Sequence, residues 1–386
     1  MPKGSSHPRL FCSVLLGTLI GLVLLDRMGA LLLPPQALFF RGWEYVSGAG
    51  RYNIPRRRLV FREREYGDLA NMLGVEQYKE WRMNTYTMDE EGYRNAHGSR
   101  RAAAPLLLSG DSFAAGVGNT DEQTFAVELE RTTGLTVEPY VPGDLSLLLR
   151  ENRFPPSASG SLLVWERVER NLTVDDAELQ KWMRDTSCLQ LTGWKRSLED
   201  WKTRVKRVIG DWVEYTHLSP VRLLGEHLFQ TLRFSWTKGH ASAVLPAEDD
   251  SDMLFFAKDV RLLGQNAEQR QLDAVADAIA HARDCLARRG LGFLVVLVPD
   301  KSHVYLSHVP PSSLPLALPS PDTMEVLQGL LRKRRIATVN LLPAFRAHAR
   351  RNELLYWNDD THWNAEGIRL AAQTVVPTVR MLLTKK

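Results

Sequence analysis

The sequence has no clustered cysteine and histidine residues, little net charge, and no basic tract interleaved with aromatic residues. Without cysteine and histidine at metal-ligand spacing, a zinc site is not expected. A net charge of +4 over 386 residues is too small to indicate nucleic acid, and no stretch offers the basic and aromatic alternation that single-strand binding requires. The sequence therefore predicts no nucleic-acid partner, no metal and no bound cofactor.

Cysteine is also scarce, with three residues in a chain whose hydrophobic content of 44% is ordinary for a globular protein. Cys12 falls in an apolar run near the N-terminus, and Cys188 and Cys285 lie in the body. In an oxidising compartment the latter two could form a disulfide. Cys285 also fits the buried stripe of a predicted helix, and this pattern favours a free core thiol.

The N-terminus carries the longest apolar run. Lys3 and Arg9 precede the uncharged stretch Leu10–Leu25, and apolar character continues to Leu33. A membrane span needs about 20 residues, so 10–33 as a whole is long enough. A cleavable signal peptide is the alternative, but 28–30 is a poor cleavage site, which favours a signal anchor. Basic residues before the span predict a cytoplasmic N-terminus (1–9) and a catalytic body outside the cytoplasm.

Beyond this span, apolar strands alternate with amphipathic helices. The strands are expected at 105–111, 137–141, 161–168, 293–298 and 336–341. Helices are expected at 120–133, 272–286, 322–334 and after His362. This alternation predicts a mainly parallel sheet with helices on both sides. Reactive groups in such a fold gather at the carboxyl ends of the strands.

The alternation breaks between about 172 and 252, where a helical insertion is expected. Tryptophan and apolar residues recur there at steps of four and three over 194–212, along one face of a helix. Basic residues occupy the rest of its surface. A helix that packs its tryptophans on the core is favoured, and an interfacial helix on the membrane is the alternative.

Two motifs predict a nucleophilic serine. Ser112 follows an apolar strand in the triplet Gly-Asp-Ser, and His362 lies near the other end of the chain. A serine hydroxyl needs an imidazole to take its proton, and a carboxylate to orient that imidazole. Asp360 lies two residues before His362 and Asp359 three, so spacing alone leaves the carboxylate open. The Gly-x-Ser-x-Gly elbow of α/β-hydrolases is absent, which indicates a different serine-hydrolase fold.

These motifs resemble the SGNH (GDSL-type) hydrolase superfamily, and more narrowly the SGNH domain of the alginate O-acetyltransferase (AlgX/AlgJ-like) family. The likeness lies in stretches 89–94, 110–113, 164–170, 298–305 and 360–364. It implies a three-layer α/β sandwich, here residues 105–386 with the insertion at about 172–252, after a connecting region at 34–104. In the family motif the aspartate directly before Thr-His belongs to the triad, which favours Asp360.

The resemblance also implies a function: a membrane-anchored extracytoplasmic O-acyltransferase that acetylates an exported polysaccharide through an acyl-serine. The acetyl donor would be a polytopic membrane-bound O-acyltransferase. Alginate members place the Asp-His motif before the serine, whereas Ser112 comes first here, so alginate as the substrate is in question. An esterase or deacetylase with the same triad, and a non-catalytic glycan-binding export scaffold, are the alternatives.

Other site residues are less constrained by the sequence. The anionic tetrahedral intermediate requires hydrogen-bond donors, and the Ser112 N–H is one candidate. Gly143 matches the second SGNH block and could supply another N–H. The asparagine of the third block is not evident, and Arg170 or Asn171 could replace it, although Glu169 and Arg170 could instead form a structural ion pair.

Two further residues have open interpretations. Lys301 follows a core strand, where it could hold an anionic sugar or be solvated. Trp363, beside the predicted general base, could stack on a sugar ring or pack in the core.

Overall fold

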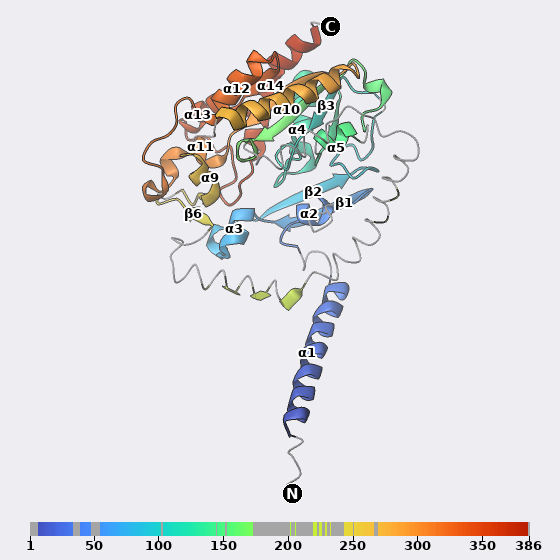
Figure 1. Ribbon diagram of the computed structural model, residues 1–386, viewed down its shortest axis with the longest axis vertical. Helices are drawn as coiled ribbons and strands as arrows, with labels where there is room; N and C mark the ends of the chain where they lie inside the picture. Colours follow the sequence, from blue (N-terminus) through green and yellow to red (C-terminus); the bar gives the residue numbers. More distant parts are fainter. Residues whose placement is uncertain are drawn as a thin grey trace.

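The computed structural model describes residues 7–33, 39–47, 55–101, 103–143, 145–150, 153–172, 243–249, 251–265 and 269–384, with a few separate residues between 201 and 232. Nearly all of the predicted tryptophan-faced helix at 194–212, and Cys188, lie outside these residues. In the described body, helices cover both faces of a central parallel sheet (Figure 1).

The central sheet has five parallel strands in the spatial order β4-β3-β5-β8-β9. Its strands are β3 (Leu106–Ser109), β4 (Val137–Tyr140), β5 (Leu162–Val168), β8 (Gly292–Val298) and β9 (Ala337–Asn340). The chain starts at β3, moves outward to β4 and returns past β3 to β5, so its winding reverses between β3 and β5. The predicted α/β fold with a mainly parallel sheet is confirmed.

The long helices form the two outer layers. α4 (Phe125–Thr133) packs against α14 (Ala365–Thr384) on one face. α10 (Gln269–Ala287) packs against α12 (Thr323–Lys333) and α5 (Leu145–Arg150). Because the connections between parallel strands are right-handed, these three helices lie on the other face of the sheet. The three-layer arrangement expected of an SGNH-like domain is thus present.

The shorter helices are α2 (Gly42–Ser47), α3 (Asp68–Leu73), α9 (Ala257–Leu262), α11 (Lys301–Val304) and α13 (Leu342–Ala349). Single 3-10 turns lie at η2 (Glu76–Tyr78), η3 (Asp121–Gln123), η4 (Pro156–Ala158), η5 (Glu169–Asn171), η6 (Leu306–His308) and η7 (Pro311–Ser313). A small antiparallel pair joins β6 (Val244–Pro246) to β7 (Leu254–Phe256), and β6 falls within the predicted insertion.

Side chains satisfy the first free N–H groups at the starts of α4, α12 and α14, whereas α3, α9, α11 and α13 have no side-chain cap. Thr120 and Gln123 form a capping box, which opens η3 directly before α4. Asn364 caps α14, because its Oδ1 accepts the N–H of Gly367 at 3.0 Å. This cap fixes the start of α14 at Ala365, three residues after His362.

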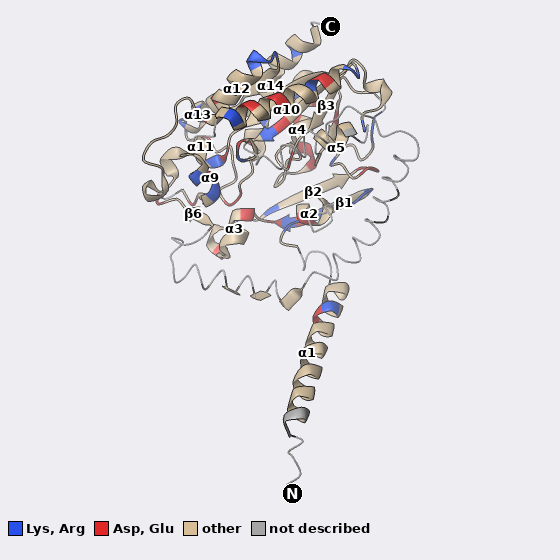
Figure 2. Cartoon of the chain, viewed as in Figure 1, with Lys and Arg blue, Asp and Glu red and all other residues tan. Residues whose placement is uncertain are grey.

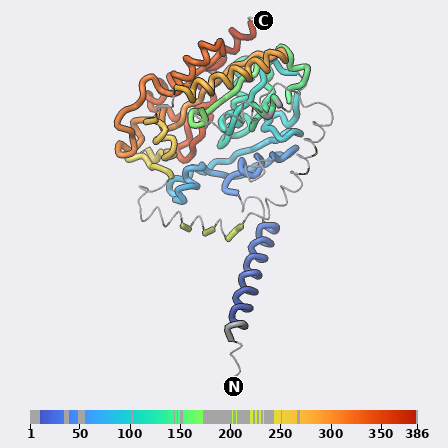
Figure 3. The backbone as a smooth tube through the Cα atoms, viewed as in Figure 1, coloured from blue at the N-terminus to red at the C-terminus, as the bar shows by residue number. Residues whose placement is uncertain are grey.

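The segment predicted as a connecting region, 34–104, contains regular secondary structure that packs on the body. β1 (Leu59–Glu65) and β2 (Arg82–Met88) form an antiparallel pair. Phe61 and Tyr86 are buried in the same hydrophobic cluster as the central sheet. In Figure 3 this blue segment runs along the side of the body that faces the N-terminal helix, and the two chain termini lie at opposite ends of the molecule. Residues 55–95 are therefore part of the packed body.

The N-terminal helix α1 (His7–Leu32) contains a stretch, Leu10–Leu32, that is long and apolar enough to cross a membrane. None of its most apolar window is buried. In Figure 2 one acid–base pair, Asp26 and Arg27 in the sequence, lies near the body-side end of α1. Arg9, near the other end, is the remaining Lys, Arg, Asp or Glu residue of this helix. Length and composition fit a membrane anchor or a signal sequence alike.

The prediction of a free thiol at Cys285 is wrong. Cys285 lies in α10 and is buried at 1% exposure, as its place on the helical stripe predicts. It is nevertheless disulfide-bonded, whereas Cys12 is free and exposed. Helical periodicity reports burial and carries no information about a bonding partner, so the pattern could not separate a core thiol from a core disulfide.

Candidate active site

Ser112 lies at the carboxyl edge of the sheet, where the winding reverses. β3 ends at Ser109, and the Asp111 carboxylate accepts the N–H of Phe113 at 2.9 Å, which shapes the turn that carries Ser112. Gly110 is needed in this turn, because a Cβ there would stand 2.6 Å from Glu166 Oε2. Ligands of open α/β sheets bind at such reversal points.

The buried Glu166 of β5 holds the same turn from the neighbouring strand. Its Oε2 accepts the N–H of Asp111 at 3.1 Å and that of Ala114 at 3.2 Å. Burial, reinforced by the nearby Asp111 carboxylate, raises the pKa of Glu166 well above its usual range. The serine turn is thus fixed to β5 at both ends.

A hydrogen-bonded chain connects Ser112 to His362 and Asp360. His362 Nε2 lies 2.7 Å from Ser112 Oγ, and His362 Nδ1 lies 2.6 Å from Asp360 Oδ1. Asp360 Oδ1 also accepts the His362 backbone N–H at 3.0 Å. The imidazole is therefore held with one nitrogen on a carboxylate and the other on a hydroxyl, as base-assisted attack by serine requires.

Trp363 joins the histidine loop to the serine turn. Its indole N–H donates to the carbonyl oxygen of Phe113 at 3.0 Å, and its own carbonyl accepts from Asn119 at 3.0 Å. The side chain is fully buried and contacts the rings of Phe113, Phe125 and Phe345. The sugar-stacking interpretation of Trp363 is wrong, because no part of its ring is open to a ligand.

Of the two adjacent aspartates, only Asp360 contacts the histidine. Asp359 points away and accepts the N–H of Gly67 at 2.6 Å and that of Glu80 at 3.0 Å. Burial raises the pKa of Asp359 to about 6, although Arg82 opposes the change. Burial also disfavours the charged form of Asp360, but the His362 and Arg41 charges outweigh it and hold the pKa of Asp360 well below its usual range.

Two arginines that the sequence did not single out hold the outer oxygen of Asp360. Arg41 Nη1 and Arg82 Nη2 each donate to Asp360 Oδ2 at 3.1 Å, and Arg82 Nη1 also donates to Asp359 Oδ1 at 2.8 Å. Both guanidiniums are almost fully buried. They come from the segment predicted as a connection, where an isolated arginine carries no sequence signal that it faces a site far along the chain.

Replacing Arg82 with glutamine should move the acid limb of the pH–rate profile to higher pH. Loss of the guanidinium removes a positive charge beside the hydrogen-bonded Asp360–His362 pair. Protonation of that pair then becomes easier, so the unprotonated form that accepts the serine proton is lost at a higher pH than in the wild type. The measurement is the rate of p-nitrophenyl acetate cleavage as a function of pH. Arg62→Gln, at an exposed position on the same hairpin, is the matched control. An unshifted limb in Arg82→Gln would contradict this role.

Asp68 is a further carboxylate beside the triad. Thr361 donates to it from both its N–H (2.8 Å) and its hydroxyl (2.7 Å), and His362 Nδ1 lies 3.8 Å away. Asp68, Asp360 and His362 are close enough to share an ion. However, Asp360 offers one oxygen to His362 and the other to two arginines, and this arrangement suits proton transfer.

The prediction of Gly143 as an oxyanion donor is wrong. Its N–H donates to the carbonyl oxygen of Gly110 at 3.0 Å, so it is already used. Glycine is required here because a Cβ would stand 2.0 Å from the Tyr140 carbonyl oxygen. The backbone N–H of Ser112 donates to no atom within the described residues. The Asn171 amide, at 3.3 Å from Asp111 Oδ2, lies beside the same turn.

Arg170 lies close to the serine turn but is engaged in ion pairs. Its Nη1 donates to Asp300 at 2.6 Å and to Asp259 at 3.0 Å, and its guanidinium stacks over the Phe113 ring at 5.2 Å. These two carboxylates more than offset the effect of burial and raise the pKa of Arg170 above its usual range. The predicted Glu169–Arg170 ion pair is not formed, since Glu169 pairs with His303 at 2.7 Å.

Lys301 is neither solvated nor open to a sugar, so both interpretations are wrong. It is 3% exposed, and its ammonium donates to the carbonyl oxygens of Trp357 and Asn358 at 2.8 Å and of Asp360 at 3.3 Å. It thereby fixes the loop that carries the triad carboxylate. Burial lowers the pKa of Lys301 to about 7, although Asp359 and Asp360 oppose the change.

Replacing Lys301 with methionine should destabilise the protein. Each carbonyl left without a donor costs about 1–3 kcal/mol. Because the pKa is about 7 folded and 10.5 for the free group, unfolding takes up a proton between these values. The contribution of Lys301 to stability therefore rises with pH across that window. Urea titrations should show a wild-type advantage over Lys301→Met that is larger at pH 9 than at pH 6; an advantage that shrinks would contradict the assignment.

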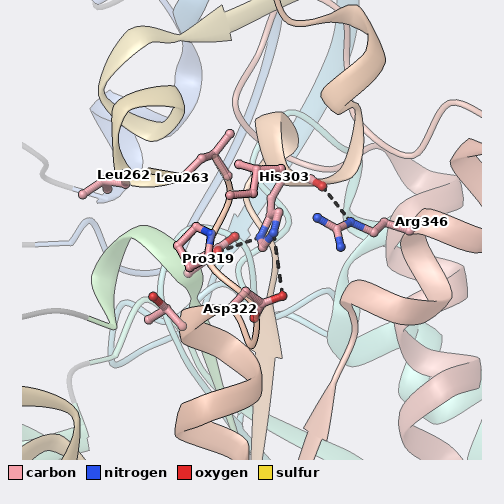
Figure 4. A pocket seen from close by; sticks show the side chains of 9 residues that line it. Leu262, Leu263, His303, Pro319, Asp322 and Arg346 are labelled. Carbon is pink, nitrogen blue, oxygen red and sulfur yellow. Dashed lines mark hydrogen bonds and ion pairs between the residues drawn. The ribbon is translucent and has the colours of Figure 1, made fainter. Parts of the chain in front are cut away.

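A separate cavity of about 100 Å³ lies beside the carboxyl ends of β5 and β8. His303 stands between Glu169, at 2.7 Å, and Asp322, at 3.8 Å, and its carbonyl accepts from Arg346 at 3.1 Å (Figure 4). Leucine and proline residues at 262, 263, 318 and 319 form the apolar wall. The polar side chains of the cavity are thus paired with one another and with nearby backbone groups of the same chain.

Comparison with known proteins places this geometry in context. Residues 250–385, which include Asp360 and His362, match the family model of the SGNH hydrolase-like domain, acetyltransferase AlgX. The probable alginate O-acetylase AlgJ of Pseudomonas syringae pv. tomato is 26% identical over 194 residues, 48% of each chain. The match thus spans about half the length of that relative. An alignment with one solved structure, at 10% identity, covers 73% of this chain and 98% of the other. Its TM-score of 0.32 is too low to indicate a shared fold.

Proposed function

We propose a function from the premise that the chain carries an SGNH hydrolase-like domain of the AlgX/AlgJ-like family. The protein is a serine-dependent O-acetyltransferase that acts on hydroxyl groups of a polysaccharide. The observation that carries the proposal is the hydrogen-bonded chain from Ser112 through His362 to Asp360. The name of the AlgJ relative supports acetyl as the group transferred and a polysaccharide as the acceptor.

The first half-reaction forms an acetyl-serine. Ser112 Oγ attacks the acetyl carbonyl of the donor while His362 Nε2 takes the hydroxyl proton. Asp360 holds the imidazole tautomer and stabilises the imidazolium. The Ser112 N–H, which donates to no atom among the described residues, would donate to the oxyanion of the tetrahedral intermediate. His362 then gives its proton to the leaving group, and the acetyl group remains on Ser112.

The second half-reaction regenerates the enzyme. A sugar hydroxyl attacks the acetyl-serine, and His362 Nε2 accepts its proton. Collapse of the second tetrahedral intermediate releases the O-acetylated sugar, and the proton returns from His362 to Ser112. With water in place of the sugar, the same steps would give an esterase, so the acceptor decides between the two activities.

The proposed arrangement in the cell depends on α1 acting as a signal anchor. As a signal anchor over 10–33, it would leave residues 1–9 in the cytoplasm and residues 34–386, which include the whole packed body, outside. This topology would place Ser112 on the same side of the membrane as an exported polysaccharide. A polytopic membrane-bound O-acyltransferase would supply acetyl groups across the membrane.

The test is to incubate the full chain in detergent with p-nitrophenyl acetate, with and without oligosaccharides. Transfer predicts acetylated oligosaccharide by mass spectrometry and a p-nitrophenol release rate that depends on the acceptor. Free acetate at the same rate whatever glycan is added would favour the esterase. Neither product would favour a non-catalytic scaffold.

A further inference from the structure

An exposed apolar stripe lies beside the body-side end of α1. The described residues at 220–221, 224–225, 228–229 and 232 are helical. Among them, Val221, Leu224, Leu228 and Leu232 recur at steps of three and four, which is the spacing of residues on one helical face. Their exposure is between 54% for Leu228 and 69% for Val221, and Phe229 beside them is 65% exposed. A face of this kind normally packs against an apolar surface.

The start of this helical segment is fixed to α1. The N–H of Val221 donates to the Asp26 carboxylate at 3.0 Å, and the Ser219 side chain bonds to the same carboxylate. Pro220 lies over Gly29, where an added Cβ would stand 3.7 Å from its ring. First-turn N–H groups have no partner within their own helix, so Asp26 acts as a cap supplied by another segment. This contact explains why Asp26, an acidic residue, stands within the apolar run of α1.

The position of Asp26 along α1 matches the depth at which interfacial helices lie in a membrane. Asp26 lies six residues before Leu32, the end of α1, which is about 9 Å at a rise of about 1.5 Å per residue. Interfacial amphipathic helices bury their apolar face about 5–10 Å into the boundary between headgroups and acyl chains. In Figure 1 the described pieces of this segment lie beside the body-side end of α1 and extend away from it to one side.

We propose that the described residues between Ser219 and Leu232 lie at the bilayer surface, with the stripe of Val221, Leu224, Leu228 and Leu232 in contact with lipid. It is distinct from the tryptophan-faced stretch at 194–212. The inference rests on the proposed insertion of α1 in the membrane. A second attachment point would restrict rotation of the body about α1, and so fix the height and orientation of Ser112 relative to a membrane-bound acetyl donor.

The test uses the full chain in phosphatidylcholine vesicles whose acyl chains are brominated, because bromine quenches nearby fluorophores. An environment-sensitive probe is attached at Leu228→Cys in a Cys12→Ser background. The same probe on native Cys12 reports insertion of α1. The matched control is Leu316→Cys, also a leucine and fully exposed on a loop of the body. Intact mass confirms that each sample carries one label.

The expected result is quenching at position 228 that approaches quenching at Cys12 and clearly exceeds quenching at position 316. Adding Asp26→Ala should lower quenching at 228 and leave it unchanged in the Cys12 sample. Quenching at Cys12 without quenching at 228 would overturn the inference. The stripe would then be covered by a protein partner or by a second copy of the chain, and α1 would still be a membrane anchor. Absence of quenching at both sites would overturn the anchor as well. Acetyl transfer, measured separately, is independent of either outcome.

Discussion

Replacement of Ser112 with alanine should abolish acetyl transfer without unfolding the protein. The hydroxyl bonds only to His362 among the described residues, so its loss leaves the turn and its contacts to Glu166 in place. Removing the nucleophile of a serine triad lowers kcat on the order of 10⁶-fold. The rate of acetyl transfer to oligosaccharide measures the effect, and circular dichroism with thermal unfolding checks the fold.

Ser302→Ala is the matched control for this variant. Ser302 is a nearby serine that is 1% exposed, and its hydroxyl has no hydrogen-bond partner within the described residues. Loss of its hydroxyl should leave the rate close to that of the wild type. Substantial transfer by Ser112→Ala would sink the covalent mechanism, and equal losses in both variants would point to a general packing defect.

Asp360→Asn and Asp359→Asn should differ strongly, although the two residues are adjacent and equally buried. An amide at position 360 can no longer hold the imidazole in the tautomer that accepts the serine proton, and the comparable change in a serine protease lowers kcat about 10⁴-fold. Asp359 does not touch His362, and its bonds go to Arg82 and to two backbone N–H groups. Its replacement should act mainly on stability.

The comparison is made on kcat for acetyl transfer, with the midpoint of urea unfolding measured for both variants. Asp360→Asn should show a large loss of kcat with near-native stability. Asp359→Asn should show near-native kcat with a large loss of stability. If Asp359→Asn lost as much kcat as Asp360→Asn while remaining folded, the assignment of Asp360 to the triad would be wrong.

The sequence predicted the framework of this site because its signals are local. A buried strand followed by Gly-Asp-Ser, and a histidine just before a final helix, each place a side chain at the carboxyl edge of a parallel sheet. The order of strands was not needed for this step, since all carboxyl ends share one edge. The choice of Asp360 came from the family motif, because a spacing of two or three residues leaves both carboxylates possible.

What the sequence missed depends on contacts between distant segments. Arg41 and Arg82 face Asp360 across more than 270 positions of chain, and an isolated arginine gives no pattern for such a contact. Gly143 was misassigned because sequence cannot tell whether an N–H already has an acceptor. Lys301 was misread because a lysine after a core strand is usually solvated, whereas here three carbonyl groups compensate its burial.

The central claim, that Ser112 carries the acetyl group between donor and glycan, is tested most directly by intact-mass spectrometry of the enzyme. The full chain is treated briefly with p-nitrophenyl acetate, freed of excess ester and then mixed with oligosaccharide. The account predicts one acetyl adduct, mapped to Ser112 and absent from Ser112→Ala, that disappears from the protein as it appears on the glycan. An adduct that forms equally in Ser112→Ala, or acetylated glycan without any acetyl-serine, would contradict it.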